Sequence, residues 1–309
     1  MNDARAAGAL AARPAGVGWV SWALLALGVL SASISAILTR YASAEHLGDA
    51  QPLAIAFWRC ALGALALAPF AAARLRSVPA RRTGSAAIAG VFLAVHFATW
   101  LTSLDLTTIA HSVLLVSISP VFVALAARFI LGERLRSLGW VGMVLALVGT
   151  AAITGGPGGD ASALGDLLAF VGGVTAGGYV FAGQLARRHL GILEYAVITY
   201  TLAAVPILAV CLARGIPLGG YGAPTWLAIA AILVGPQLLG HTILNLVVKD
   251  IGATVVSVAI MAEPPIAVVA AFLLFGEVPS AIVYPAGAVI LTGIYLVSRA
   301  RMVGPVVTD

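Results

Sequence analysis

The segment EPPIAVVAAFLLFGEVP, residues 263–279, has a counterpart in SPVFVALAARFILGERL, residues 119–135. Both segments carry Pro at the second position and Gly-Glu twelve residues after it, and the offset between them is 144 residues. This offset is close to half of the 309-residue chain. A repeat at that distance predicts a chain built from two related halves, residues 1–154 and residues 155–309.

The composition is that of a membrane protein. Hydrophobic residues make up 61% of the chain and charged residues only 9%, whereas soluble domains carry about 25% charged residues. The apolar runs are long enough for an α-helix to cross the hydrocarbon layer, which takes about 20 residues. We therefore expect an all-α integral membrane protein.

Ten apolar runs can be distinguished, and each predicts one transmembrane helix. They cover residues 18–38, 53–73, 84–104, 109–131, 138–154, 164–186, 194–213, 224–247, 252–275 and 281–298.

The basic residues predict the orientation of these spans. If the N-terminus is cytoplasmic, fourteen of the seventeen Lys and Arg residues fall at the cytoplasmic ends of spans. This bias follows the positive-inside rule, so both termini are expected in the cytoplasm. Five spans separate the two copies of the repeat, and an odd number means that the copies cross in opposite directions. Inverted five-helix repeats are a common plan of secondary transporters.

The five-plus-five arrangement, the sequence FWR at residues 57–59 and the two Pro-x11-Gly-Glu segments together resemble the drug/metabolite transporter superfamily. The EamA-type branch is the most similar, and within it bacterial exporters of amino acids, including aromatic ones. The resemblance implies a multi-pass protein of the bacterial inner membrane that works by alternating access. It also implies a central cavity lined by spans one, three, four, six, eight and nine, with spans five and ten at the periphery.

Glu263 is the only charged residue near the middle of span nine, and two prolines follow it directly. A charge at that depth costs about 2.5–3.5 kcal/mol on insertion scales, so such residues usually face a cavity or a partner. Because proline lacks an N–H group, the helix is expected to break here. Glu263 either binds the amine of a cargo or handles protons, or it is a protonated carboxyl that caps its own helix break.

Span three places His96, Trp100 and Ser103 on one helical face, at i, i+4 and i+7. We predict that this face lines the cavity and that Trp100 offers a flat apolar wall. The alternative for His96 is a packing role inside the helix bundle.

Span eight carries a matching polar stripe, in which His241 and Asn245 lie deepest. We predict that both face the cavity, and the alternative is hydrogen bonding between helices. Tyr179 of span six and Ser35 of span one are predicted to line the same cavity. Their spans are rich in small residues, which otherwise serve close helix packing.

The roles of five further residues can also be predicted. Arg59, within span two, either snorkels outward, pairs with a loop acid such as Asp49 or Asp105, or binds a carboxylate of the cargo. Glu133 and Glu277 of the two Gly-Glu pairs are expected to be structural. Pro120 and Pro264 are candidate hinges.

The glycine-rich stretch GGPGGDASALG, residues 155–165, is a linker and no phosphate loop, because it lacks the GK[ST] ending. No motif for a metal or a cofactor stands out, and we expect neither.

The sequence as a whole predicts a transporter that exports amino acids, including aromatic ones, or similar small metabolites. Transport of sugars, nucleosides or cationic drugs is an alternative. A membrane-embedded enzyme acting on lipids or isoprenoids is another, but it would cluster acids or histidines at one interface. The expected partners are a small-molecule cargo and membrane lipid, without nucleic acid, and the expected state is a monomer.

Overall fold

The computed structural model describes residues 17–43, 50–107, 109–154, 162–275, 280–300 and 302–303. Asp49, Glu277 and most of the expected linker lie outside the described residues.

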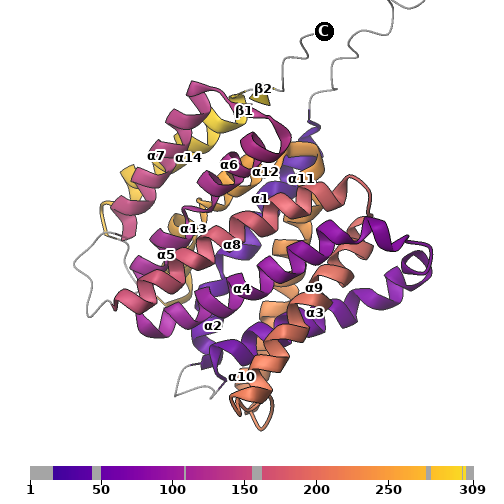
Figure 1. The fold of residues 1–309 in the computed structure, drawn as a ribbon. Helices are drawn as coiled ribbons and strands as arrows, with labels where there is room; N and C mark the ends of the chain where they lie inside the picture. Colours follow the sequence, from indigo (N-terminus) through magenta and orange to yellow (C-terminus); the bar gives the residue numbers. More distant parts are fainter. Residues whose placement is uncertain are drawn as a thin grey trace, which may run out of the picture.

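The described chain is a bundle of helices with one two-residue strand pair (Figure 1). The first half contains α1 (Trp19–Ser33), α2 (Ser35–Ser43), α3 (Pro52–Leu75), the 3₁₀ helix η2 (Ala80–Arg82), α4 (Gly84–Leu106), α5 (Ile109–Val116), α6 (Ser119–Leu131), β1 (Arg134–Leu135) and α7 (Ser137–Thr154). The second half contains α8 (Ala163–Arg187), α9 (Ile192–Ala213), α10 (Ala223–Ile232), the π-helix η3 (Leu233–Thr242), α11 (Ile243–Ile251), α12 (Ala253–Ile260), α13 (Glu263–Phe275), α14 (Val283–Arg299) and β2 (Met302–Val303).

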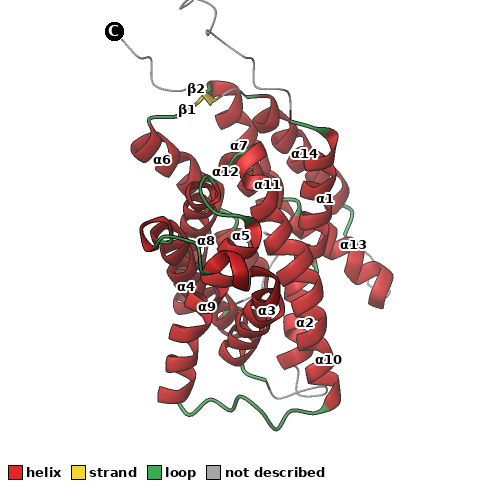
Figure 2. Ribbon diagram, turned by 90° about the vertical axis from the view of Figure 1, so that its right-hand side faces the viewer, coloured by secondary structure: helices red, strands yellow, loops and turns green. Residues whose placement is uncertain are grey.

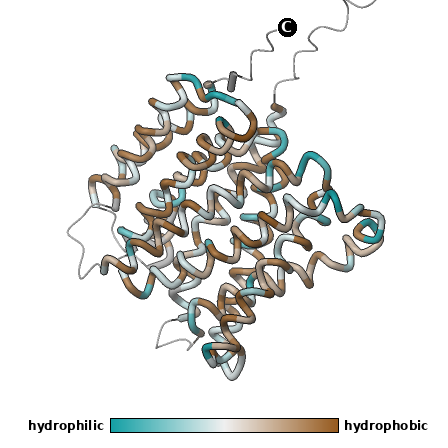
Figure 3. Tube along the Cα trace, in the orientation of Figure 1, coloured by the Kyte–Doolittle hydropathy of each residue, from teal (hydrophilic) through white to brown (hydrophobic). Residues whose placement is uncertain are grey.

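The surface of the bundle is apolar, as a lipid-facing surface is. Trp19 is 80% exposed, Phe129 78% and Leu273 73%. Hydrophobic residues run along the helices, while hydrophilic residues gather at the turns (Figure 3). Among the described residues, seven helices are long and apolar enough to span a membrane, and three shorter apolar helices accompany them. The chain is therefore a multi-pass membrane protein, and each predicted run overlaps a described helical stretch.

Helices of the two halves pack against each other in pairs. α3 packs on α9, and α7 packs on α14 at one corner of the bundle (Figure 1). α4 packs on α8, and the equivalent pair in the repeat is α1 against η3 and α11. The third span of each half therefore lies beside the first span of the other half, and these four spans form the centre of the bundle.

Four of the apolar stretches are interrupted near their middle. α5 ends two residues before α6, and α12 ends two residues before α13, so both breaks precede the expected prolines. The first span, expected as one continuous helix over residues 18–38, instead breaks at Ile34. There the Ser33 hydroxyl donates to the Val29 carbonyl at 2.7 Å, a bond that often bends helices. In the eighth span, Pro236 lies inside the π-helix η3.

Polar contacts tie the loops together at two opposite ends of the bundle. At one end lie Arg74–Glu194 at 3.8 Å, Arg188–Glu133 at 4.0 Å, Ser21–Asp250 at 3.3 Å and the antiparallel pair of β1 with β2. At the other end lie Thr107–Asp166 at 2.7 Å and the bond from the Trp58 indole to the Leu218 carbonyl at 3.0 Å. Figure 2 shows β1 and β2 at one end and the loop before α10 at the other.

Candidate functional site

A cavity lies where the interrupted helices meet, and it measures about 1100 Å³ when its opening is included. Its walls come from α1–α2, α4, α5–α6, α8, η3–α11 and α12–α13, and no described residue of α7 or α14 contributes. These are spans one, three, four, six, eight and nine, as the sequence resemblance implied.

One wall of the cavity is a stack of two flat side chains from α4. The rings of His96 and Trp100 lie 5.5 Å apart with an angle of 8° between their planes. His96 is fixed by a 2.9 Å bond between its Nδ1 and the Gly172 carbonyl of α8. Because a carbonyl oxygen only accepts, Nδ1 carries the hydrogen of that bond. The buried Trp100 Nε1 has no hydrogen-bond partner among the described residues.

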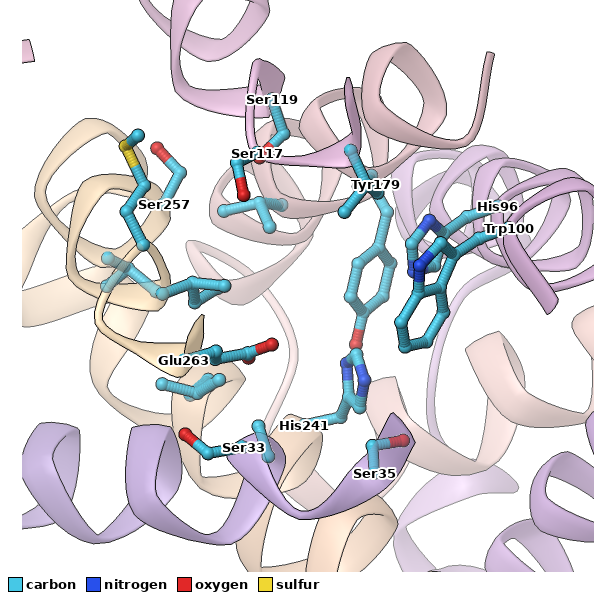
Figure 4. Close-up of a pocket in the computed structure, with 18 of the residues that line it drawn as sticks. Ser33, Ser35, His96, Trp100, Ser117, Ser119, Tyr179, His241, Ser257 and Glu263 are labelled. Atoms are coloured by element: carbon cyan, nitrogen blue, oxygen red, sulfur yellow. The ribbon is translucent and has the colours of Figure 1, made fainter. Parts of the chain in front are cut away.

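A second wall joins α8 to the eighth span through Asn245. Its side-chain amide donates to the Tyr179 hydroxyl at 2.5 Å and to the His241 carbonyl at 2.7 Å. The rings of Tyr179 and His241 lie 5.8 Å apart. Tyr179 and His241 both lie at the cavity (Figure 4). Asn245 also lines it and bonds to α8 through Tyr179, so for Asn245 the helix–helix bonding and the cavity lining expected as alternatives occur together.

Glu263 is the first residue of α13 and reaches the cavity from the side opposite Trp100 (Figure 4). The side chain is half-buried. Within the described part of the chain, no hydrogen bond or ion pair reaches its carboxylate, from His96, His241 or any other residue. The cavity therefore presents one acid that is unpaired, at the start of a helix.

Arg59 is fully buried behind this cavity and does not line it. Its Nε donates to the Gln237 side chain at 2.9 Å and its Nη1 donates to the Ser35 hydroxyl at 3.3 Å. The guanidinium also lies 4.0 Å above the Phe97 ring centre. The expectation of outward snorkelling or of a pair with Asp105 is therefore wrong, because Arg59 points into the bundle and Asp105 is exposed.

The cavity brings together most of the residues predicted to line it. Those on its wall are Ser35, His96, Trp100, Tyr179, His241, Asn245 and Glu263, and the candidate hinge Pro264 lies there too. Their binding and hinge roles stay predictions.

One of the residues predicted to line the cavity lies elsewhere. Ser103 is buried beyond the cavity, where its hydroxyl contacts the Trp100 carbonyl at 2.6 Å and the Ser112 hydroxyl at 2.7 Å. Its placement on the cavity wall is therefore corrected. The candidate hinge Pro120 is buried in the first turn of α6, and its neighbour Ser119 lies on the cavity wall.

Four serines on the wall had no binding role in the sequence interpretation: Ser33, Ser117, Ser119 and Ser257. The repeat offers a signal for one of them. At the offset of 144 residues, Ser119 is the counterpart of Glu263.

Comparison with known proteins identifies a matching family and two similar proteins. The model of the EamA-like transporter family matches residues 19–155 and again residues 163–299. A probable terminal-alkyne amino-acid exporter of Streptantibioticus cattleyicolor is 28% identical over 195 residues, which are 61% of this chain and 64% of that protein. The match thus spans less than two thirds of the exporter's length. The uncharacterized transporter YdfC of Bacillus subtilis is 22% identical over 247 residues, 79% of this chain and 80% of that protein.

A solved crystal structure shares the fold. It superposes with a TM-score of 0.74 and covers 90% of this chain and 96% of its own, at 21% sequence identity. At that identity the likeness concerns the arrangement of helices alone.

Proposed function

Because the chain belongs to the EamA-like transporter family, we propose that it is a secondary transporter, and not an enzyme, that exports amino acids, including aromatic ones, or similar small metabolites. The relative named as a probable amino-acid exporter supports this cargo class. The observation that carries the proposal is the cavity itself, in which one unpaired carboxylate faces a flat aromatic wall. A carboxylate is complementary to the ammonium group that all amino acids share, and an indole is complementary to an aromatic or aliphatic side chain.

The proposed topology has ten transmembrane helices in two inverted repeats, with both termini on the cytoplasmic side of a bacterial inner membrane. The end-to-end contacts support it, because loops joined at one end of the bundle alternate along the chain with loops joined at the other. The end that holds Arg74, Arg134 and Arg188 is the basic one, which the positive-inside rule assigns to the cytoplasm.

Transport then proceeds by alternating access, in which the two repeats rock around the cavity. The breaks before α6 and α13 favour Pro120 and Pro264 as hinges, because the helical ladder is interrupted at both places.

A cationic aromatic drug is a second cargo class that the same observation favours. An acidic side chain would bind the cation of such a compound, and a flat aromatic wall would bind its ring. Because the compound has no carboxylate, the cavity would need no group that binds one. Sugars and nucleosides stay alternatives, with hydroxyl-bearing residues on the wall as their support.

The test is uptake by the purified protein in liposomes, with labelled amino acids, sugars, nucleosides and a quaternary aromatic amine as the panel. We expect uptake of amino acids, strongest for aromatic ones. Uptake of the quaternary amine alone would replace the amino-acid proposal by drug transport, and uptake of sugars or nucleosides alone would exclude both.

A further inference from the structure

Two half-helices begin at the cavity, and they occupy equivalent positions in the two repeats. α6 begins at Ser119 and α13 begins at Glu263, 144 residues later. Each follows a two-residue turn, and each has proline as its second residue. Both Ser119 and Glu263 line the cavity. The repeat has therefore placed two helix starts at one site, with different side chains at the equivalent position.

The start of a helix attracts negative charge. The aligned peptide dipoles place a partial positive charge there. At α6, Pro120 has no N–H group and the Val121 N–H already donates to the Ile118 carbonyl at 3.0 Å, so the helix dipole carries the attraction. At α13, Glu263 supplies an acidic side chain in the first turn. The first turn of α6 contains no acidic residue. The partial positive charge of α6 is thus left without an anion of the protein's own.

Ser119 adds a second, independent sign of a missing ligand. The residue is only 8% exposed, it lines the cavity, and no hydrogen bond to another described residue reaches its hydroxyl. That hydroxyl is therefore open to a molecule in the cavity. The neighbouring Ser117 differs, because its hydroxyl already donates to the Val113 carbonyl at 2.7 Å. Figure 4 shows Ser117 and Ser119 together at one side of the cavity and Glu263 at another.

We propose that the start of α6, with the Ser119 hydroxyl, binds the carboxylate of the cargo while Glu263 binds its ammonium group. This inference rests on the proposed function and sharpens it, because the cavity then recognises an α-amino acid as a zwitterion, one charge at each helix start. The stacked His96 and Trp100 remain available for the side chain.

Arg59 is the other group in the interior that attracts a carboxylate. It stands behind Ser35, and its Nε and Nη1 are engaged by Gln237 and Ser35, while its buried Nη2 has no hydrogen-bond partner among the described residues. The guanidinium does not line the cavity, so the cargo meets Ser119 and not Arg59.

The test compares three probes that share one ring and differ in charge: phenylalanine, phenethylamine, which lacks the carboxylate, and 3-phenylpropionate, which lacks the ammonium group. Binding is measured on the purified full-length protein. The variants are Ser119→Ala, Ser119→Asp, which mirrors the acid of the other repeat, and Ser119→Thr, which keeps a hydroxyl. Ser117→Ala is the matched control, since its hydroxyl is already engaged.

We expect the wild type to prefer phenylalanine over both analogues. Loss of a hydrogen bond to a charged group should weaken phenylalanine and 3-phenylpropionate about tenfold in Ser119→Ala, with phenethylamine unchanged. Ser119→Asp should weaken both carboxylates further, while Ser119→Thr and Ser117→Ala should keep the wild-type preference.

Several results would overturn the inference. If the Ser119 variants lose the same amount of affinity for phenylalanine and for phenethylamine, the inference is wrong, but the proposed amino-acid transport is unaffected. Equal wild-type affinities for those two probes would do the same, whether or not any variant folds. Absence of phenylalanine binding and transport in the wild type would instead remove the proposed function and this inference with it.

Discussion

Trp100 supplies a flat apolar surface because its indole stacks on His96, which α8 holds in place. Replacing it by alanine removes an aromatic contact worth on the order of 1–3 kcal/mol. We expect Trp100→Ala to weaken phenylalanine transport roughly ten- to hundredfold and alanine transport much less. Liposome uptake of both amino acids measures this.

The control for that change is Trp100→Phe, which keeps an aromatic wall and should retain most of the phenylalanine uptake. An equal loss for phenylalanine and alanine would mean that the indole serves packing and does not contact the cargo.

Glu263 can be examined through pH, because only the ionised carboxylate attracts an ammonium group. Wild-type binding of amino acids should therefore weaken as the pH falls and Glu263 takes up a proton. Glu263→Gln is nearly isosteric and does not titrate, so its weaker binding should show no such dependence. Binding titrations over a pH series measure both proteins. If Glu263 is only a protonated cap, the glutamine variant keeps the wild-type affinity and pH profile.

Single residues differ in how far the sequence could predict them. His96 and Trp100 follow from helical periodicity, and the structure places both on the cavity wall. Periodicity fixes the face of a helix but not the depth of a residue, and Ser103 lies seven residues, about 10 Å, farther along α4 than His96. There α5 covers it through Ser112. The hydrogen-bond partners of Arg59 could not be predicted from the sequence, because they come from other spans.

At the scale of elements, the turn between α5 and α6 is positioned by its close approach to α8. A Cβ atom at Gly177 of α8 would lie 2.8 Å from the Ser119 carbonyl oxygen, too close for an unshifted backbone. Small residues allow such approaches between membrane helices. The glycines of α8 thus serve packing, and through packing they place the serines of the cavity wall.

Gly177→Ala should therefore destabilise the protein by about 1–3 kcal/mol, the usual cost of overpacking. Thermal unfolding in detergent measures this. Gly84→Ala is the matched control, because a Cβ atom there would meet nothing within 4 Å, and alanine is the better helix former. An unchanged unfolding temperature for Gly177→Ala would show that α8 does not fix the turn.

The interruptions of the helices were only partly visible in the sequence. Proline marks the breaks before α6 and α13, because it cannot donate to the helical ladder. At Ile34 no proline is present, and the break coincides with a serine that bonds back to its own helix. Serine makes such bonds in many helices that continue, so this residue type predicts no break.

At the scale of the molecule, the internal repeat predicted the two halves, and the family resemblance predicted which helices line the cavity. Composition alone predicts that helices cross the membrane but not which of them enclose a cavity. The position of α7 and α14 away from the cavity depends on tertiary packing, in which each covers the other. The boundary at residues 154 and 155 stays a prediction.

The orientation of the whole molecule is the last prediction, and two loops at opposite ends of the bundle decide it. Ala80 lies in the basic connection between α3 and α4, and Gly219 lies in the connection between α9 and α10; both are exposed. The native Cys60 and Cys211 are buried, so a membrane-impermeant thiol reagent should leave them unmodified in intact cells. The positive-inside rule places Ala80 in the cytoplasm. We therefore expect the reagent to label Gly219→Cys in intact cells, and Ala80→Cys only after the membrane is opened. Labelling of Ala80→Cys in intact cells, with Gly219→Cys protected, would invert the topology, and with it the assignment of the basic end to the cytoplasm.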